Sequence, residues 1–219
     1  MISKRMKLLP ALFLCVAAAA CGPSEGFQQV PWDMAIDANT QLERLQGLAP
    51  TTENNMPTTG SASYTGSALL RLDPNTFAEF DDIAIVADAA IDVDFSGAGN
   101  VTGRIDGYEA VTGAGTALQT RVPSSGEILI GEDESLVGTA GLNNAWAADY
   151  RGNINVDGTN YIVDDVLIGG FLGNRTRDPT PERITKGIVG GIDTLPPQFA
   201  TSNGVRTPFD IVVIGETPR

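Results

Sequence analysis

The sequence predicts an all-β protein: a single soluble eight-stranded antiparallel β-barrel preceded by a signal peptide and a short linker or helix. Three observations predict this fold. From Ser61 onward, apolar and polar residues alternate with the period of two that is typical of strands with one dry and one wet face. Turn residues separate these runs, and Asp157-Gly158 is the strongest hairpin signal among them. No convincing long helix interrupts the series, and a sheet of so many strands needs closure or a second layer to protect its edges.

Eight segments show this pattern. In 83–95 the odd positions are apolar, whereas Asp92 and Asp94 lie on the opposite face. In 145–156 Trp146 and Tyr150 share the apolar face. The alternation slips in 159–173 at Asp164-Asp165, which indicates a β-bulge. The predicted strands are 61–72, 83–95, 100–110, 126–131, 145–156, 159–173, 184–193 and 207–215.

Small residues are abundant on the faces predicted to point inward, which suits a narrow, strongly curved barrel. The interior of an eight-stranded barrel is either just filled by its own side chains or wide enough for one small ligand. A sandwich is the competing fold. A barrel inserted in the membrane is disfavoured, because the outer faces carry charges and aromatic residues make up only 6% of the chain. The small inward residues are Ala87, Ala89, Gly103, Ala148, Gly152 and Gly190.

Residues 1–20 have the features of a lipoprotein signal peptide. Three basic residues precede an apolar run over 8–20, which is too short to cross a hydrocarbon core of about 30 Å as a helix. Three alanines then precede Cys21, an arrangement that resembles a bacterial lipobox. Cys21 is therefore predicted to carry the lipid, palmitate included, after cleavage. The alternative is an ordinary secretory signal beside a chance cysteine.

The segment 21–59 is predicted to be the lipidated N-terminus and a linker to a barrel domain over 60–219. Within it, Asp37 to Leu48 fits a short helix, with Ile36, Leu42 and Leu45 near helical spacing. Disorder is the alternative for this stretch. Because the chain is acidic, the linker is expected to hold the barrel off the membrane as a tether.

The absence of histidine excludes a Ser-His-Asp or Cys-His triad, a histidine-held zinc ion and a histidine-ligated haem. The formal net charge of −13 argues against nucleic-acid binding, which needs a basic face. Loss of Lys4, Arg5 and Lys7 with the signal peptide lowers the charge to −16. A cationic or protein partner is therefore favoured over an anionic one.

Four short motifs occur in order between residues 56 and 193. They are Met56-Pro-Thr-Thr-Gly60 with Ser61-Ala-Ser-Tyr64-Thr-Gly66, then Ile91-Asp-Val-Asp-Phe95 with Val101-Thr-Gly-Arg-Ile105, then Gly169-Gly-Phe171-Leu-Gly173, then Gly187-Ile-Val-Gly190-Gly191. In this order, behind a lipobox, they resemble the solute-binding β-barrel domain of transferrin-binding protein B-like surface lipoproteins. In that family the third motif is a turn, and the fourth carries an aromatic residue where this chain has Val189.

This resemblance implies an outer-membrane lipoprotein, displayed at the cell surface or the periplasmic face with the help of an outer-membrane translocator. It also implies a barrel that binds an extracellular protein or a small solute, often in the acquisition of iron carriers. Large two-lobed members recognise transferrin through long loops and a handle domain, which this chain is expected to lack. Transferrin binding is therefore not carried over, and no motif residue transfers as a ligand contact.

Acidic clusters are the first candidates for a metal site. Asp92-Val-Asp94 resembles the start of a calcium loop, but the twelfth position is Gly103 instead of glutamate, so the EF-hand pattern fails. Two solvent-facing strand aspartates are the favoured interpretation. Glu132-Asp133-Glu134 and Asp164-Asp165 offer oxygen ligands for a metal such as calcium, but solvated acidic turns are the favoured interpretation.

Tyrosine and methionine are the other candidate iron ligands, since histidine is absent and Cys21 is predicted to carry lipid. Tyr64 and Tyr150 fit inward faces, where they are expected to be core residues whose hydroxyls find partners; Trp146 is likewise predicted to be core. No cofactor, metal or catalytic residue is predicted. The remaining candidates are Tyr108, Tyr161, Met34 and Met56.

Three functions remain: a barrel that captures a solute or protein, a structural or accessory lipoprotein acting through protein contacts, and, least favoured, a hydrolase using paired carboxylates. A pocket at one mouth of the barrel would favour solute capture. An interior filled by side chains would favour protein contacts, with loops 73–82, 111–125 and 174–183 as expected contact regions.

Overall fold

The computed structural model describes residues 33–73, 82–113, 120–139, 142–173, 185–191 and 198–218. The predicted signal peptide and Cys21 lie outside these ranges, as do most of the loops 73–82 and 174–183. Within the described part of the chain, no helix is both long and apolar enough to cross a membrane.

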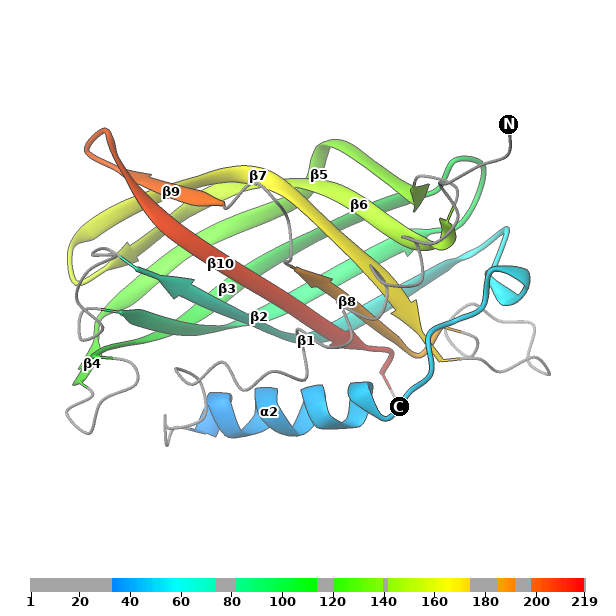
Figure 1. Cartoon of the computed structure of the whole chain (residues 1–219), viewed down its shortest axis with the longest axis horizontal. Coiled ribbons are helices and arrows are strands. Elements are labelled where there is room, and N and C mark those ends of the chain that lie inside the picture. Colours follow the sequence, from blue (N-terminus) through cyan, green and yellow to red (C-terminus); the bar gives the residue numbers. More distant parts are fainter. Residues whose placement is uncertain are drawn as a thin grey trace, which may run out of the picture.

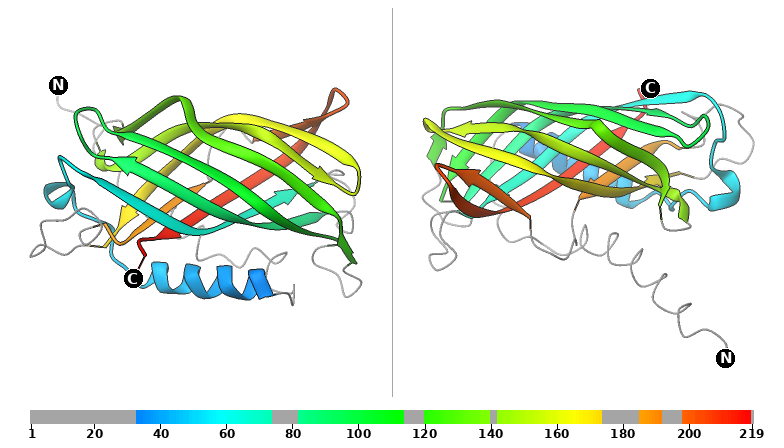
Figure 2. Two further views of the ribbon diagram at one scale, coloured as in Figure 1. Left: turned by 180° about the vertical axis from the view of Figure 1, so that it is seen from behind. Right: turned by 90° about the horizontal axis from the view of Figure 1, so that it is seen from above.

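Eight antiparallel strands close into a barrel (Figures 1 and 2). They are β1 (Ser61–Leu72), β2 (Ile83–Asp94), β3 (Asn100–Thr112), β5 (Ser124–Thr139), β6 (Leu142–Val156), β7 (Thr159–Leu172), β8 (Gly187–Gly191) and β10 (Val205–Glu216). The ring closes where β1 pairs with β10, from Thr65 opposite Glu216 to Leu72 opposite Phe209. The fold is therefore the predicted closed barrel and not a sandwich, and each predicted strand is present.

Two short strands were not predicted. β4 (Thr120–Val122) pairs with β3 inside the stretch expected to be loop. β9 (Phe199–Ser202) forms a hairpin with β10 and also touches β7. The β9–β10 turn places Asn203 and Gly204 at positive φ, 49° and 78°, the type I′ geometry that suits strand twist. The predicted Asp157-Gly158 turn has the same geometry, with φ values of 49° and 81°.

The alternation of β2 separates core from surface as predicted. Its odd-numbered residues are buried, whereas Asp88, Asp92 and Asp94 are exposed. The same holds in β6, where Trp146 and Tyr150 are buried. The buried faces of the strands join into one apolar core that fills the barrel.

The predicted bulge at Asp164-Asp165 is absent, because β6 and β7 pair without interruption through these residues. Asp165 is nevertheless exposed although its neighbours in the alternation point inward. Within the described residues, β7 pairs with β9 at Ile162–Val163 and with β8 from Gly169 onward. Asp165 lies between these two pairings, where its side chain reaches water. The irregularities lie instead in the pairing of β2 with β3 and of β5 with β6.

The predicted helix exists, begins four residues early and packs on the barrel. α2 (Asp33–Gln46) runs along the outer face of β1, β2 and β10, and a 3-10 helix, η1 (Glu53–Asn55), follows it (Figure 1). Of the apolar residues that were noted at helical spacing, Leu45 is buried, whereas Ile36 is 55% exposed. Ala35 and Ala38 are buried beside Leu45, so the contact face is rotated toward small residues that let the helix approach the sheet.

Specific contacts fix α2 to the barrel. Gln41 Nε2 donates to the carbonyl oxygen of Thr65 at 3.0 Å. Arg44 donates to both carboxylate oxygens of Glu216, at 3.1 and 2.7 Å. Beyond the helix, Thr51 N–H donates to the carbonyl of Phe171 at 2.8 Å. The described part of the expected linker is therefore packed against the barrel.

Candidate functional site

The indole of Trp146 fills part of the barrel interior. The side chain is fully buried, and mostly small residues are in register with it on the neighbouring strands. A Cβ atom on Gly169 or Gly190 would overlap this indole. The interior around Trp146 therefore holds protein side chains, as the narrow bore predicted from small inward residues requires. The residues in register are Trp146, Gly169, Gly190, Val213, Ala68 and Ala87.

The inward tyrosines are core residues with satisfied hydroxyls, as predicted. Tyr64 Oη donates to Thr185 Oγ1 at 2.7 Å, and Tyr150 Oη donates to Gln198 Oε1 at 3.0 Å. Gln198 is buried and in turn donates to the carbonyl of Val166 at 3.2 Å. These hydroxyls hold segments of the chain together inside the barrel.

Burial raises the pKa of Tyr108 and of Tyr150 far above the ordinary phenol value, and nearby carboxylates add to the effect. The folded state therefore keeps these protons while the unfolded chain releases them above about pH 10. Stability should be unaffected by these groups below that pH and should fall as pH rises through it. We expect alkaline unfolding, followed by circular dichroism, to coincide with tyrosinate absorbance at 295 nm. Titration of all four tyrosines in the still-folded protein would contradict this.

The remaining candidate iron ligands are dispersed. Met34 packs with the residues beneath α2, whereas Met56 packs against the barrel core. Tyr108 donates to the carbonyl of Ile105, and Tyr161 is buried in the core. In the part of the chain that the structure describes, no three Asp, Glu, His or Cys side chains are grouped as a metal site would require.

The Glu132-Asp133-Glu134 run is a bulge inside β5 and not a turn between strands. Pairing with β6 stops at Ile130 and resumes at Ser135. The neighbouring strand supplies the missing partners. Asp149 accepts hydrogen bonds from the backbone N–H groups of Asp133 and Glu134, at 3.4 and 2.9 Å. Arg151 contacts the carboxylates of both Glu132 and Asp133, each at 2.6 Å. The cluster thus shapes the strand.

The two strand aspartates of β2 are solvent-facing, as predicted. Asp92 accepts a hydrogen bond from Ser63 Oγ at 2.5 Å, and Asp94 accepts one from the backbone N–H of Ser96 at 2.8 Å. Two hydrogen bonds from Ser96, first that of its backbone N–H and then that of its side chain, lower the pKa of Asp94. Asp94 therefore fixes the start of the β2–β3 turn.

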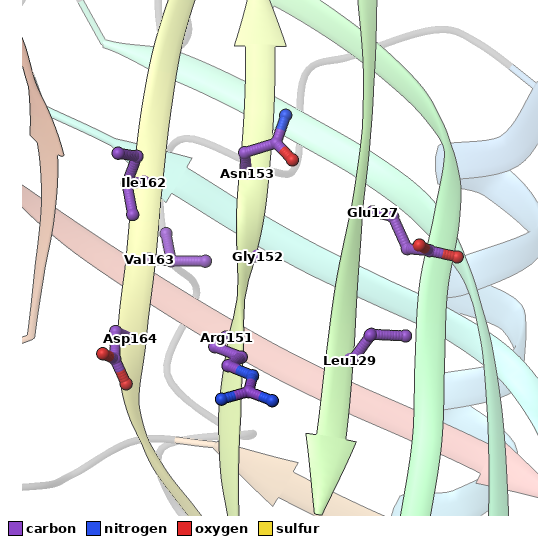
Figure 3. Close-up of a pocket in the computed structure, with 8 residues that line it drawn as sticks. All are labelled: Glu127, Leu129, Arg151, Gly152, Asn153, Ile162, Val163 and Asp164. Atoms are coloured by element: carbon purple, nitrogen blue, oxygen red, sulfur yellow. The ribbon is translucent and has the colours of Figure 1, made fainter. Parts of the chain in front are cut away.

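A shallow groove of about 380 Å³ crosses the outside of the barrel over β5, β6 and β7 (Figure 3). Leu129 and Ile162 supply apolar surface, whereas Arg151 and Asp164 supply charge. Asn153 and Glu127 complete its outer rim. Because this groove lies on the wall and not in a mouth of the barrel, it fits contact with a protein surface better than enclosure of a solute.

Aliphatic side chains continue this surface along β7 and β5. Ile162, Val166 and Ile168 are 56%, 44% and 44% exposed, and Leu136 is 40% exposed. This surface was missed from the sequence. Its signal is present, since β7 is apolar on both faces apart from its two aspartates, and a strand apolar on both faces is expected to be covered on both.

Fold and surface together define a closed eight-stranded antiparallel barrel with a packed interior and a partly apolar outer wall. No protein-family model matches the sequence, and no curated protein sequence matches it. Among solved structures, the chain is similar to a double mutant of the vaccine antigen transferrin-binding protein B from Haemophilus parasuis, with a TM-score of 0.41 and 15% identity. The similarity covers 77% of this chain and 28% of that one. A likeness at this score assigns neither family nor ligand.

Proposed function

We propose that this chain is an outer-membrane lipoprotein, anchored through Cys21, whose barrel binds a protein ligand at its outer surface and performs no catalysis. The packed interior carries this proposal. Trp146, Tyr64, Tyr150, Phe171 and Phe209 are almost completely buried inside the ring. Binding at the outer surface is therefore favoured over capture of a solute within the barrel.

The docked helix supports anchoring close to the membrane. Cys21 lies twelve residues before Asp33, where α2 begins. Even a fully extended chain of that length spans only about 40 Å. Because α2 is fixed to β1 and β10, the barrel would stay within that reach of the lipid. It would then present the wall opposite α2 for contact with a partner.

The anchor is tested by substituting Cys21 in the full-length precursor. Cys21→Ser should abolish labelling by radioactive palmitate and release the chain from the outer-membrane fraction, because no second acylation site would remain. The matched variant Cys15→Ser should keep both the label and the location. Surface display is measured separately by protease treatment of intact cells, where wild-type cleavage is expected. Unchanged labelling in Cys21→Ser, or a wild-type chain without lipid, would contradict the proposed anchor.

A further inference from the structure

The outer wall of the barrel has two sides that are covered differently. Beneath α2, the outward residues Leu69, Ala84, Val86 and Val111 are at most 7% exposed. The strands β5, β6 and β7 lie on the opposite side of the barrel (Figures 1 and 2). Outward aliphatic residues of β5 and β7 are exposed there. Among the described residues, α2 thus covers one apolar part of the wall, and no helix covers the other.

The bare part is continuous across three strands. Leu136 on β5, Ala147 on β6 and Ile168 on β7 are aligned by the strand register. Val166 and Ile162 extend this row along β7, with Asp164 between them. We call these residues the β7 face.

The charged side chain within the β7 face is acidic. Arg151 is the one basic residue beside it on β6, and this guanidinium is already held by Glu132 and Asp133. Within the described ranges, Asp164 forms no ion pair. A partner that covers the aliphatic residues would therefore bring this carboxylate close to its own charges.

We propose that the β7 face docks a cationic amphipathic segment of a protein partner. This inference rests on the proposed function and names the chemistry of the partner. Leucine-like side chains of the segment would cover Leu136, Val166 and Ile168, while lysine or arginine would pair with Asp164. The chain already uses the same arrangement on its other side, where Arg44 of α2 pairs with Glu216 beside buried aliphatic contacts.

Charge argues against two other occupants. A second copy seated on this face by two-fold symmetry would place the two copies of Asp164 opposite or beside one another. The formal charge of −13 for the whole chain opposes such pairing further. An anionic lipid surface would be repelled in the same way. A cationic protein segment gains from both the apolar residues and the carboxylate of Asp164.

The test uses a fluorescent helical peptide of roughly 18 residues, built from leucine and lysine at helical spacing, and the lipid-free mature chain. The described fold begins at Asp33, so Cys21 is not part of it. Anisotropy should show binding, and amide exchange should slow over 159–172. Val166→Ser with Ile168→Ser should weaken binding about tenfold. Asp164→Asn should weaken it about threefold.

Matched variants separate docking from general attraction. Val205→Ser removes an aliphatic residue that is 65% exposed but lies on the β9–β10 hairpin. Asp37→Asn removes the same charge from the exposed side of α2. Both control variants should change binding by less than about twofold. Equal weakening by Asp164→Asn and Asp37→Asn, or equal binding of a leucine–glutamate peptide, would overturn the inference. Neither result touches anchoring through Cys21, whereas a chain without lipid would overturn the proposed function regardless of the peptides.

Discussion

Trp146→Ala should lower the free energy of unfolding by about 3–5 kcal/mol, the range for truncating a fully buried large side chain. The indole is completely buried, and it lies against Gly169 and Gly190 on neighbouring strands. Glycines have no side chain that could turn into the space left behind. We therefore expect the cavity to persist, and the loss to fall in the upper half of that range. Urea unfolding followed by far-ultraviolet circular dichroism measures it.

Two further variants sharpen this result. Trp146→Phe keeps most of the volume and also removes an indole N–H that is buried without a hydrogen-bond acceptor, so it should cost much less. Leu136→Ala truncates a side chain that is 40% exposed and should cost about 1 kcal/mol or less. A loss for Trp146→Ala no greater than that of Leu136→Ala would mean that the indole is not what fills the barrel.

Period-two alternation made most of the barrel predictable, because it records which face of each strand is buried. The bounds of β1 were predicted without error, and β2 ends one residue earlier than predicted. In both strands the buried face is continuous and the exposed face is polar. Closure itself followed from strand number, since eight paired strands leave two edges that can satisfy each other.

Short strands escaped prediction because alternation needs several residues to become visible. β9 has only four residues, Phe199–Ser202, and shares its hairpin with a strand that was predicted alone. Asn203-Gly204 is a type I′ turn dipeptide like Asp157-Gly158. The turn residues therefore indicate this hairpin, whereas the alternation of its short strand does not. Arg206 over the ring of Phe199, 3.9 Å from its centroid, adds a contact across this hairpin.

Cross-strand chemistry explains the remaining differences. Glu132-Asp133-Glu134 looks like a turn until Asp149 and Arg151 of the next strand are placed beside it. No local pattern in the sequence contains that neighbour. The helix face is a similar case, since Ile36 is more hydrophobic than Ala38 but only a small residue fits close to the sheet.

The candidate binding surface was hidden for a different reason. Its residues lie on strands that were identified by the alternation of their inward, buried residues. The outward residues Val166 and Ile168 were therefore given no role. Only the structure shows that α2 covers the opposite wall and leaves this one open. The site prediction made from sequence, Cys21, concerns attachment and lies outside the described residues.

Gly190→Val should destabilise the barrel by about 3 kcal/mol, near the upper end for overpacking a well-filled core. Its Cβ would point at the rings of Trp146, which is rigid and has no free volume to move into. Gly47→Ala is the matched control for adding a methyl group, because a Cβ there meets its nearest atom, a backbone oxygen of Arg44, at 3.4 Å. That control should change stability by less than about 0.5 kcal/mol.

Combining Gly190→Val with Trp146→Ala tests whether the two residues share one space. In the Trp146→Ala background the valine enters the cavity, so it should be neutral or stabilising instead of destabilising. The double-mutant cycle should then give a coupling of about 3 kcal/mol, the upper end for residues in contact. Urea midpoints of the four proteins at matched slopes measure it. Additive losses in the double variant would show that Gly190 and Trp146 act independently, and would refute the assignment of one shared, filled space inside this barrel.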